Sequence, residues 1–191
     1  SAGVQGLGRH LMRIGFAGVG GIGSNVAWML VRSGMLELFL VDFDRVELSN
    51  LNRQFYFVSQ IGLPKVEALS HNLKAINPQI QIRTSMTRLD PGNCATLFSG
   101  CDLVVEGLDR EEDKKMLLES LHHGQKVVSA CGIAGSALDS IRVRRLGHCL
   151  VAGDFATDCA HAPLFAHKVS CVAAYMAGLI MQEAGGQYDN R

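Results

Sequence analysis

Polar clusters at the ends of apolar runs carry the residue types that bind and activate phosphate. The first is a glycine-rich turn, Gly18-Val-Gly-Gly-Ile-Gly23-Ser24, between an apolar run and a segment with helical periodicity. Glycines permit a tight turn, let backbone N–H groups approach a phosphate, and place that phosphate at a helix N-terminus. We therefore expect this turn to bind nucleotide phosphates through Gly18, Gly20, Gly21, Gly23 and Ser24.

Asp42 ends the next apolar run, Leu38 to Val41. It follows the glycines by roughly 20 residues, where a Rossmann unit places an acidic residue on the ribose hydroxyls. Alone, Asp42 would be an ordinary strand-end residue; after the glycine turn we interpret it as the ribose ligand. The G-x-G-x-x-G spacing also fits dinucleotide-binding enzymes, so an NAD-binding Rossmann oxidoreductase stays open.

Further polar residues follow Asp42, and a site that only binds a dinucleotide does not need them. Attack on phosphorus builds negative charge, which fixed cationic and amide donors stabilise. Lys65 follows Pro64 at the start of an amphipathic helix, so its ammonium group is free to turn back toward the sheet. We predict nucleotide contacts for Asp44, Asn50, Arg53, Gln54 and Lys65, with catalytic roles for Arg53 and Lys65.

Asp109 lies just past the apolar run that begins at Asp102. Open parallel sheets bind their ligands beyond the carboxyl ends of strands. Mg²⁺ is usually held by one or two carboxylates plus substrate phosphates. Asp109 is therefore the predicted metal ligand and a third catalytic residue. We assign no role to Asp102, at the far end of the run, or to Glu106, which is either solvated or paired.

Strand-like apolar runs alternate with segments of helical periodicity along the chain. The expected strands are 13–17, 37–42, 80–86, 102–107, 126–130 and 140–146; the expected helices are 23–33, 64–76, 91–99, 111–122 and 164–184. This alternation predicts an α/β fold: a Rossmann-like, mostly parallel sheet flanked by helices, with an antiparallel C-terminal extension. A chain of 191 residues suits one domain, residues 1–191.

These motifs together resemble the ThiF/MoeB family, relatives of the enzymes that activate ubiquitin-like proteins. The shared features are Gly-x-Gly-Gly-x-Gly-Ser, Asp-x-Asp, Ser49-Asn-Leu-Asn-Arg-Gln54, Gly-x-Pro-Lys65 and the strand-end Asp109. The order and spacing are specific, and the resemblance covers nearly the whole chain. It is strongest to the short ThiF-type branch associated with thiamine biosynthesis.

The resemblance implies an adenylyltransferase that uses ATP and Mg²⁺. It implies adenylylation of the C-terminal glycine carboxylate of a ThiS-like sulfur carrier, release of pyrophosphate, and a homodimer. A sibling interpretation has a different acceptor, a tRNA nucleoside carboxylate or a peptide. An oxidoreductase is disfavoured because no acid/base for hydride transfer is evident. A scaffold that only senses nucleotide is a third hypothesis, because Arg110 and Lys168 depart from the family pattern.

The cysteines also depart from the family pattern. Many members hold a structural zinc with two Cys-x-x-Cys pairs, but the six cysteines here form no such pair, so we expect no zinc. Some members bond the activated carrier to a cysteine, for which Cys159 is the candidate. We interpret Cys159 as inert, because few charged residues near it in sequence could lower its pKa.

Composition limits the partners. Eighteen basic and eighteen acidic residues give no net charge and no electrostatic case for nucleic acid. We interpret the arginines of 141–145 first as a solvated strand face and second as a patch for an acidic carrier. Ser1 to Gly8 do not resemble a signal peptide, the cysteines suit a reducing cytoplasm, and the longest apolar run, 172–181, is too short to cross a membrane.

Overall fold

A seven-stranded sheet organises the fold, in the order β3-β2-β1-β4-β5-β7-β6. The computed structural model describes residues 10–185, so the expectation about Ser1 to Gly8 lies outside the described residues. The strands are His10–Ala17 (β1), Met35–Val41 (β2), Gln81–Ser85 (β3), Leu103–Glu106 (β4), Lys126–Ala130 (β5), Arg142–Leu146 (β6) and Cys149–Gly153 (β7). Neighbouring strands are parallel except β6 and β7, so the predicted α/β class with an antiparallel end is confirmed.

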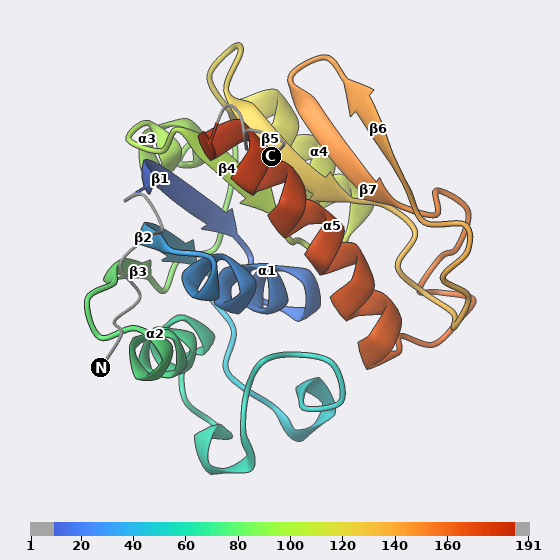
Figure 1. Ribbon diagram of the computed structural model, residues 1–191, viewed down its shortest axis with the longest axis horizontal. Helices are drawn as coiled ribbons and strands as arrows, with labels where there is room; N and C mark the ends of the chain where they lie inside the picture. Colours follow the sequence, from blue (N-terminus) through green and yellow to red (C-terminus); the bar gives the residue numbers. More distant parts are fainter. Residues whose placement is uncertain (1–9, 186–191) are drawn as a thin grey trace, which may run out of the picture.

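Helices cover both faces of the sheet (Figure 1). The helices are α1 (Gly21–Arg32), α2 (Lys65–Ile76), α3 (Cys94–Phe98), α4 (Glu111–Ser120) and α5 (Ala166–Gly185). The apolar sides of α1, α2 and α5 join one buried cluster, and those of α3 and α4 join a second cluster on the opposite face. None of the helices within residues 10–185 is long and apolar enough to cross a bilayer.

The sequence prediction lacks β7, and this is its main error in the fold. The chain turns at Gly147, whose φ of 60° lies in the left-handed region, and returns as β7 beside β6. All five residues of β7 are buried between β5 and β6. Such a run shows no alternation of apolar and polar residues, and five apolar residues are too few to mark a strand by periodicity.

The strand order reverses beside β1, and this fixes where a ligand can bind. β2 lies on one side of β1 and β4 on the other, so the chain leaves the centre of the sheet in both directions. Open α/β sheets bind ligands at such a switch point, beyond the carboxyl ends of the strands. The long connection from β2 to α2, which contains the short 3-10 helices η1 (Leu48–Asn50) and η2 (Val58–Gln60), starts from the same edge (Figure 1).

Candidate active site

A cavity of about 380 Å³ opens beyond the carboxyl ends of β1, β2 and β4. Six residues predicted to bind nucleotide or metal line it: Gly18, Gly20, Asp42, Asp44, Lys65 and Asp109. Its apolar lining comes mainly from the segments after β3 and β4 and from α4, through Leu89, Leu108 and Met116. The cavity therefore joins the glycine turn to a side near α4 where charged residues such as Asp109 and Asp113 alternate with these apolar side chains.

The glycine turn is held tightly against the loop after β4. Gly18 has φ of 89°, and a Cβ atom there would lie 2.8 Å from the carbonyl oxygen of Gly107. A Cβ atom on Gly23 would clash with the carbonyl oxygen of Gly18. Neither position accepts a side chain, because each would separate the turn from its neighbours.

Asp42 shapes this turn as well as lining the cavity. Its Oδ2 atom accepts a hydrogen bond from the Val19 N–H at 2.8 Å, and its Oδ1 atom accepts one from the Asp44 N–H at 2.8 Å. Burial raises the pKa of Asp42, although these two hydrogen bonds and nearby Lys65 oppose the shift. Each carboxylate oxygen can accept a further hydrogen bond, as binding to ribose hydroxyls requires.

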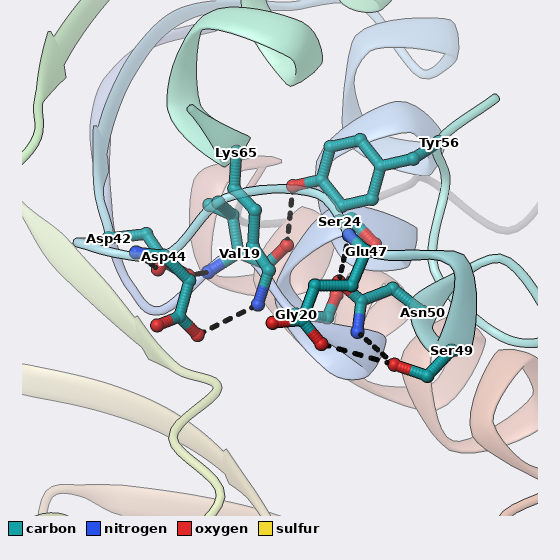
Figure 2. A network of polar contacts seen from close by, with 10 residues as sticks. All are labelled: Val19, Gly20, Ser24, Asp42, Asp44, Glu47, Ser49, Asn50, Tyr56 and Lys65. Atoms are coloured by element: carbon teal, nitrogen blue, oxygen red, sulfur yellow. Dashed lines mark hydrogen bonds and ion pairs between the residues drawn. The ribbon is translucent and has the colours of Figure 1, made fainter. Parts of the chain in front are cut away.

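Lys65 and Asp44 form an ion pair at the edge of the cavity (Figure 2). The Lys65 Nζ atom lies 2.9 Å from Asp44 Oδ2. The lysine side chain is only 6% exposed, whereas the aspartate side chain is 44% exposed. The ammonium group of Lys65 thus points back toward the sheet, as predicted, and it pairs with the water-facing carboxylate of Asp44.

Arg53 and Gln54 do not line the cavity but lie against the start of α1. The Arg53 Cγ and Cδ atoms approach Gly21, and Nε2 of Gln54 lies 3.7 Å from where a Cβ atom on Gly20 would be. The Oε1 atom of Gln54 is buried and has no hydrogen-bond partner among residues 10–185. Since the O and N atoms of a glutamine amide are assigned from their partners, this unpartnered end next to the turn could offer either atom.

Asn50 and Ser24 make their hydrogen bonds within the protein. Asn50 Oδ1 accepts a hydrogen bond from the Glu47 N–H, which closes the turn of η1. The Ser24 hydroxyl donates to the Gly20 carbonyl oxygen at 2.6 Å and accepts from the Phe55 N–H at 3.0 Å. Ser24 is fully buried, so it connects the glycine turn to the polar segment instead of presenting its hydroxyl to the cavity.

The segment after β4 is fixed by Glu106, a residue for which the sequence predicted no role. Its carboxylate is fully buried, accepts hydrogen bonds from Lys114 at 2.9 and 2.8 Å and from Ser129 at 2.6 Å, and also accepts one from the Leu108 N–H. Asp109 is exposed at the cavity and makes no ion pair among the described residues. The sequence did contain one signal for the role of Glu106: it is the single charged residue within the apolar run 103–106.

Two arginines at the cavity were also missed. The Arg88 guanidinium lies 4.9 Å from the ring centre of Phe43, and both residues line the cavity. Arg110, noted only as a departure from the family, lines it too and lies 3.4 Å from the exposed Glu112. Because both arginines are far from the glycines in sequence, only the strand-end rule that located Asp109 could have indicated them.

Lys168 and Cys159 do not line the cavity. Lys168 is fully buried and pairs with Asp154 at 2.6 Å, which joins α5 to the loop after β7. Cys159 is an exposed free thiol in that loop. No group of three or more metal-ligating side chains occurs within residues 10–185, so a metal at Asp109 would need ligands from a bound molecule.

Comparisons with known proteins agree with this geometry. The model of the ThiF family matches residues 4–185. The chain belongs to the ThiF family. This confirms the family predicted from the motifs, with its Rossmann-like fold; the thiamine branch is not resolved by the match.

Several ThiF-related proteins are similar in sequence to parts of this chain. Ubiquitin-like modifier-activating enzyme 5 of Xenopus laevis is 48% identical over 80 residues, 40% of this chain and 20% of that protein. The tRNA threonylcarbamoyladenosine dehydratase 2 of Saccharomyces cerevisiae is 38% identical over 125 residues, 63% of this chain and 28% of that protein. The matched stretches thus span less than a third of the length of these two relatives.

Solved structures share the fold of this ThiF-family chain. The Escherichia coli tRNA N6-threonylcarbamoyladenosine dehydratase TcdA, in complex with AMP, superposes with a TM-score of 0.76 at 20% identity, over 94% of this chain and 89% of that one. Escherichia coli MccB with ATP superposes with a TM-score of 0.73 at 20% identity, over 93% of this chain and 57% of that one. At these identities the similarity is one of fold.

Proposed function

We propose that this chain transfers AMP from ATP to a carboxylate acceptor and releases pyrophosphate. One observation carries the proposal: the glycine turn, Asp42, Lys65 and Asp109 line one cavity at the switch point of a ThiF-family fold. The solved complexes of TcdA with AMP and ATP, and of MccB with ATP, support ATP as the nucleotide. The phosphates would lie at Gly20 and the start of α1, and the ribose at Asp42.

The chemistry follows from the charges near that turn. An acceptor carboxylate attacks the α-phosphorus of ATP, the bond to the pyrophosphate breaks, and an acyl-adenylate forms. The carboxylate is already ionised at neutral pH, so no general base is needed. Lys65, which lines the cavity, and Arg53, which lies outside the cavity lining but against Gly21 at the start of α1, would stabilise the negative charge that builds on the phosphate oxygens. Mg²⁺, which neutralises phosphate charge, would be held by Asp109 together with those oxygens.

The favoured acceptor is the carboxylate of a modified tRNA nucleoside. The similarity to the yeast tRNA threonylcarbamoyladenosine dehydratase extends over 63% of this chain, and the fold of TcdA matches 94% of it. A dehydratase can use the same first step: once the carboxylate carries AMP, an internal nucleophile attacks the acyl carbon, AMP leaves, and the acceptor has lost the elements of water.

A second candidate acceptor is the C-terminal carboxylate of a ubiquitin-like protein. The 48% identity to ubiquitin-like modifier-activating enzyme 5 favours it, but over 80 residues only. The predicted ThiS-like carrier and thiamine role fall within this class and have no separate support. The hydride-transfer alternative is less favoured, since the named relatives activate or dehydrate their substrates.

Two exposed arginines offer a contact surface for an anionic acceptor. The guanidinium groups of Arg142 and Arg144 lie 5.6 and 4.4 Å from the ring centre of Phe155. Neither forms an ion pair within the part of the chain that the structure describes, unlike Arg145, which pairs with Glu183. Their charges are therefore available to phosphates of RNA or to an acidic protein.

The predicted homodimer has support from an exposed apolar surface. Apart from Phe43, which lines the cavity, five large apolar side chains on the connection between β2 and α2 are at least 44% exposed: Leu48, Phe57, Val58, Ile61 and Leu63. Contiguous exposed apolar residues often mark protein interfaces. Sedimentation of the wild type against Phe57→Ser tests the dimer, and a wild-type monomer at all concentrations would exclude it.

All six cysteines are free thiols, which supports the proposed cytoplasmic location.

ATP–pyrophosphate exchange with Mg²⁺ tests the function, with three acceptors in parallel: threonylcarbamoylated tRNA, unmodified tRNA and a ubiquitin-like protein ending in Gly-Gly. Exchange that depends on the modified tRNA supports the favoured acceptor, and exchange that depends on the protein supports the second. Arg53→Ala and Asp109→Ala should each lower the rate by about 10²-fold or more. Asp139→Ala, an exposed residue that does not line the cavity, is the control. Normal rates in both variants would exclude the assignment.

The arginine surface has its own test, the salt dependence of binding. If Arg142 and Arg144 contact RNA phosphates, the double variant Arg142→Ala/Arg144→Ala should bind tRNA more weakly and lower the slope of log K against log salt by about two. Arg32→Ala, on α1, is the control. An unchanged slope would show that this surface does not bind RNA, and an acidic protein would be the remaining candidate partner.

A further inference from the structure

Val19, in the middle of the glycine turn, is held on both sides by buried side chains (Figure 2). Its N–H donates to Asp42 Oδ2 at 2.8 Å. Its carbonyl oxygen accepts a hydrogen bond from the Tyr56 hydroxyl at 2.7 Å. Tyr56 comes from the connection between η1 and η2, 37 residues further along the chain, and is only 5% exposed.

The hydrogen bond from Tyr56 also fixes the direction of a neighbouring donor. The carbonyl of Val19 and the N–H of Gly20 belong to one planar trans peptide unit, so they point in opposite directions. When Tyr56 holds the carbonyl, the Gly20 N–H must point away from the tyrosine. Gly20 lines the cavity, and its N–H donates no hydrogen bond to another residue within 10–185.

The tyrosine suits this task because it stays a donor. Burial raises the pKa of Tyr56 well above its usual value, and the nearby charges of Asp42 and Asp44 add to the shift. The phenol therefore stays protonated throughout the physiological pH range. The Val19 carbonyl oxygen has no other donor among the described residues, and Val19 itself is fully buried.

We propose that Tyr56 is a positioning residue for nucleotide phosphate: through the Val19 carbonyl it keeps the Gly20 N–H directed at the phosphate-binding end of the cavity. This deepens the proposed function and rests on it for the identity of the ligand. Asp42 fixes the preceding peptide unit in the same way, so one side chain holds each side of Val19. Backbone donors at a helix N-terminus bind phosphate best when their direction is set in advance.

The test compares Tyr56→Phe with the wild type in direct binding of adenosine and ATP by calorimetry. The variant keeps the buried ring and removes only the hydroxyl. We expect ATP to bind about fivefold to tenfold more weakly, the worth of about one hydrogen bond, and adenosine to bind within about twofold of the wild type. Tyr175→Phe, a half-exposed tyrosine on α5, is the matched control and should change neither affinity.

A purely structural role for Tyr56 would give a different result. Equal weakening of adenosine and ATP would overturn the proposal, and so would unchanged ATP affinity. The amide NMR signal of Gly20 gives a second readout: ATP should shift it in the wild type and shift it less in Tyr56→Phe. An equal shift in both proteins would also overturn the proposal.

These outcomes are separate from the fate of the proposed reaction. If ATP binding depends on the tyrosine hydroxyl but no acceptor is adenylylated, the role of Tyr56 stands and the proposed function fails. If adenylylation occurs and Tyr56→Phe binds ATP normally, the function stands and the role of Tyr56 fails.

Discussion

Two lysine–aspartate pairs lie in different surroundings, and the contrast separates chemistry from support. Lys65 pairs with Asp44 at 2.9 Å, and Lys168 pairs with Asp154 at 2.6 Å. Both lysines are buried, but Asp44 is 44% exposed at the cavity, whereas Asp154 is 3% exposed. Lys65 can therefore exchange its partner for a phosphate, while Lys168 cannot leave Asp154 without leaving two buried charges unpaired.

The hydrogen bonds that Asp154 accepts strengthen this contrast. Asp154 accepts hydrogen bonds from Lys168, from the N–H groups of Ala156 and Thr157, and from the Thr157 hydroxyl. They hold the turn in which Phe155 takes a φ of 61°, a left-handed conformation that a phenylalanine rarely adopts. A buried charge with this many partners defines local structure, whereas a pair with one side in water is free to serve a ligand.

The largest effect should come from breaking the fully buried pair. Lys168→Met leaves the Asp154 carboxylate buried without its cation, so the free energy of unfolding should fall by about 3–5 kcal/mol. Urea denaturation measures it. Lys115→Met, which breaks an exposed pair with Glu119, is the matched control and should cost less than about 1 kcal/mol. Similar losses in both variants would show that burial does not distinguish these pairs.

Lys65→Met should show the reverse pattern. Its free energy of unfolding should change by less than about 1 kcal/mol, because Asp44 is left facing water. Adenylate formation should fall by about 10²-fold, since the variant removes a cation that stabilises charge in the transition state. Denaturation and pyrophosphate exchange on one preparation measure both. A stability loss as large as that of Lys168→Met, with normal exchange, would assign Lys65 to the structural class.

Acid should weaken the buried pair of Lys168 and Asp154, because Lys168 helps to hold the pKa of Asp154 down. Burial raises the pKa of Asp154, but the hydrogen bonds from Lys168, Thr157 and Ala156 outweigh it and hold the pKa far below its usual value. The folded state thus binds this proton less readily than the unfolded state. The stabilisation is complete above the unfolded pKa of about 4 and is lost as the pH falls through the depressed folded value.

Denaturation of the wild type and Lys168→Met at pH 6, 4 and 3 measures that dependence. The wild type should lose on the order of 1 kcal/mol more than the variant over this range, because the variant lacks the cation that depresses the pKa. Other carboxylates titrate equally in both proteins and cancel. Parallel curves would mean that Lys168 does not set the pKa of Asp154.

Local patterns in the sequence were enough to predict the nucleotide end of the site. The glycine turn, Asp42 and Asp109 are each marked by their position after an apolar run, and the cavity brings them together. The alternation of strands and helices likewise predicted the confirmed α/β class. These features depend on neighbours along the chain, which a sequence displays directly.

The missed features depend on contacts between distant residues. Tyr56 meets Val19 across 37 positions, and Glu106 meets Ser129 across 23. On sequence grounds Lys168 was noted only as a departure from the family pattern, and the structure gives it a partner, Asp154. No local period marks such pairs, because they arise only when the strand order brings separate loops to one edge of the sheet.

Asp44→Asn should have the smallest effect, a slight increase in ATP affinity. The direction of this change tests the contrast between the two lysine–aspartate pairs most sharply. If Lys65 leaves Asp44 to meet a phosphate, the wild type must first break the ion pair and hold a carboxylate near the incoming negative charge. The variant removes both costs, so ATP should bind about threefold more tightly while adenosine binds as before; this difference is below 1 kcal/mol, as expected for a pair with an exposed partner. Calorimetry with both ligands measures it, and Asp90→Asn, an exposed aspartate that does not line the cavity, is the control. Weaker ATP binding in Asp44→Asn would show instead that Asp44 holds the nucleotide itself, and that the Lys65 pair persists when the site is filled.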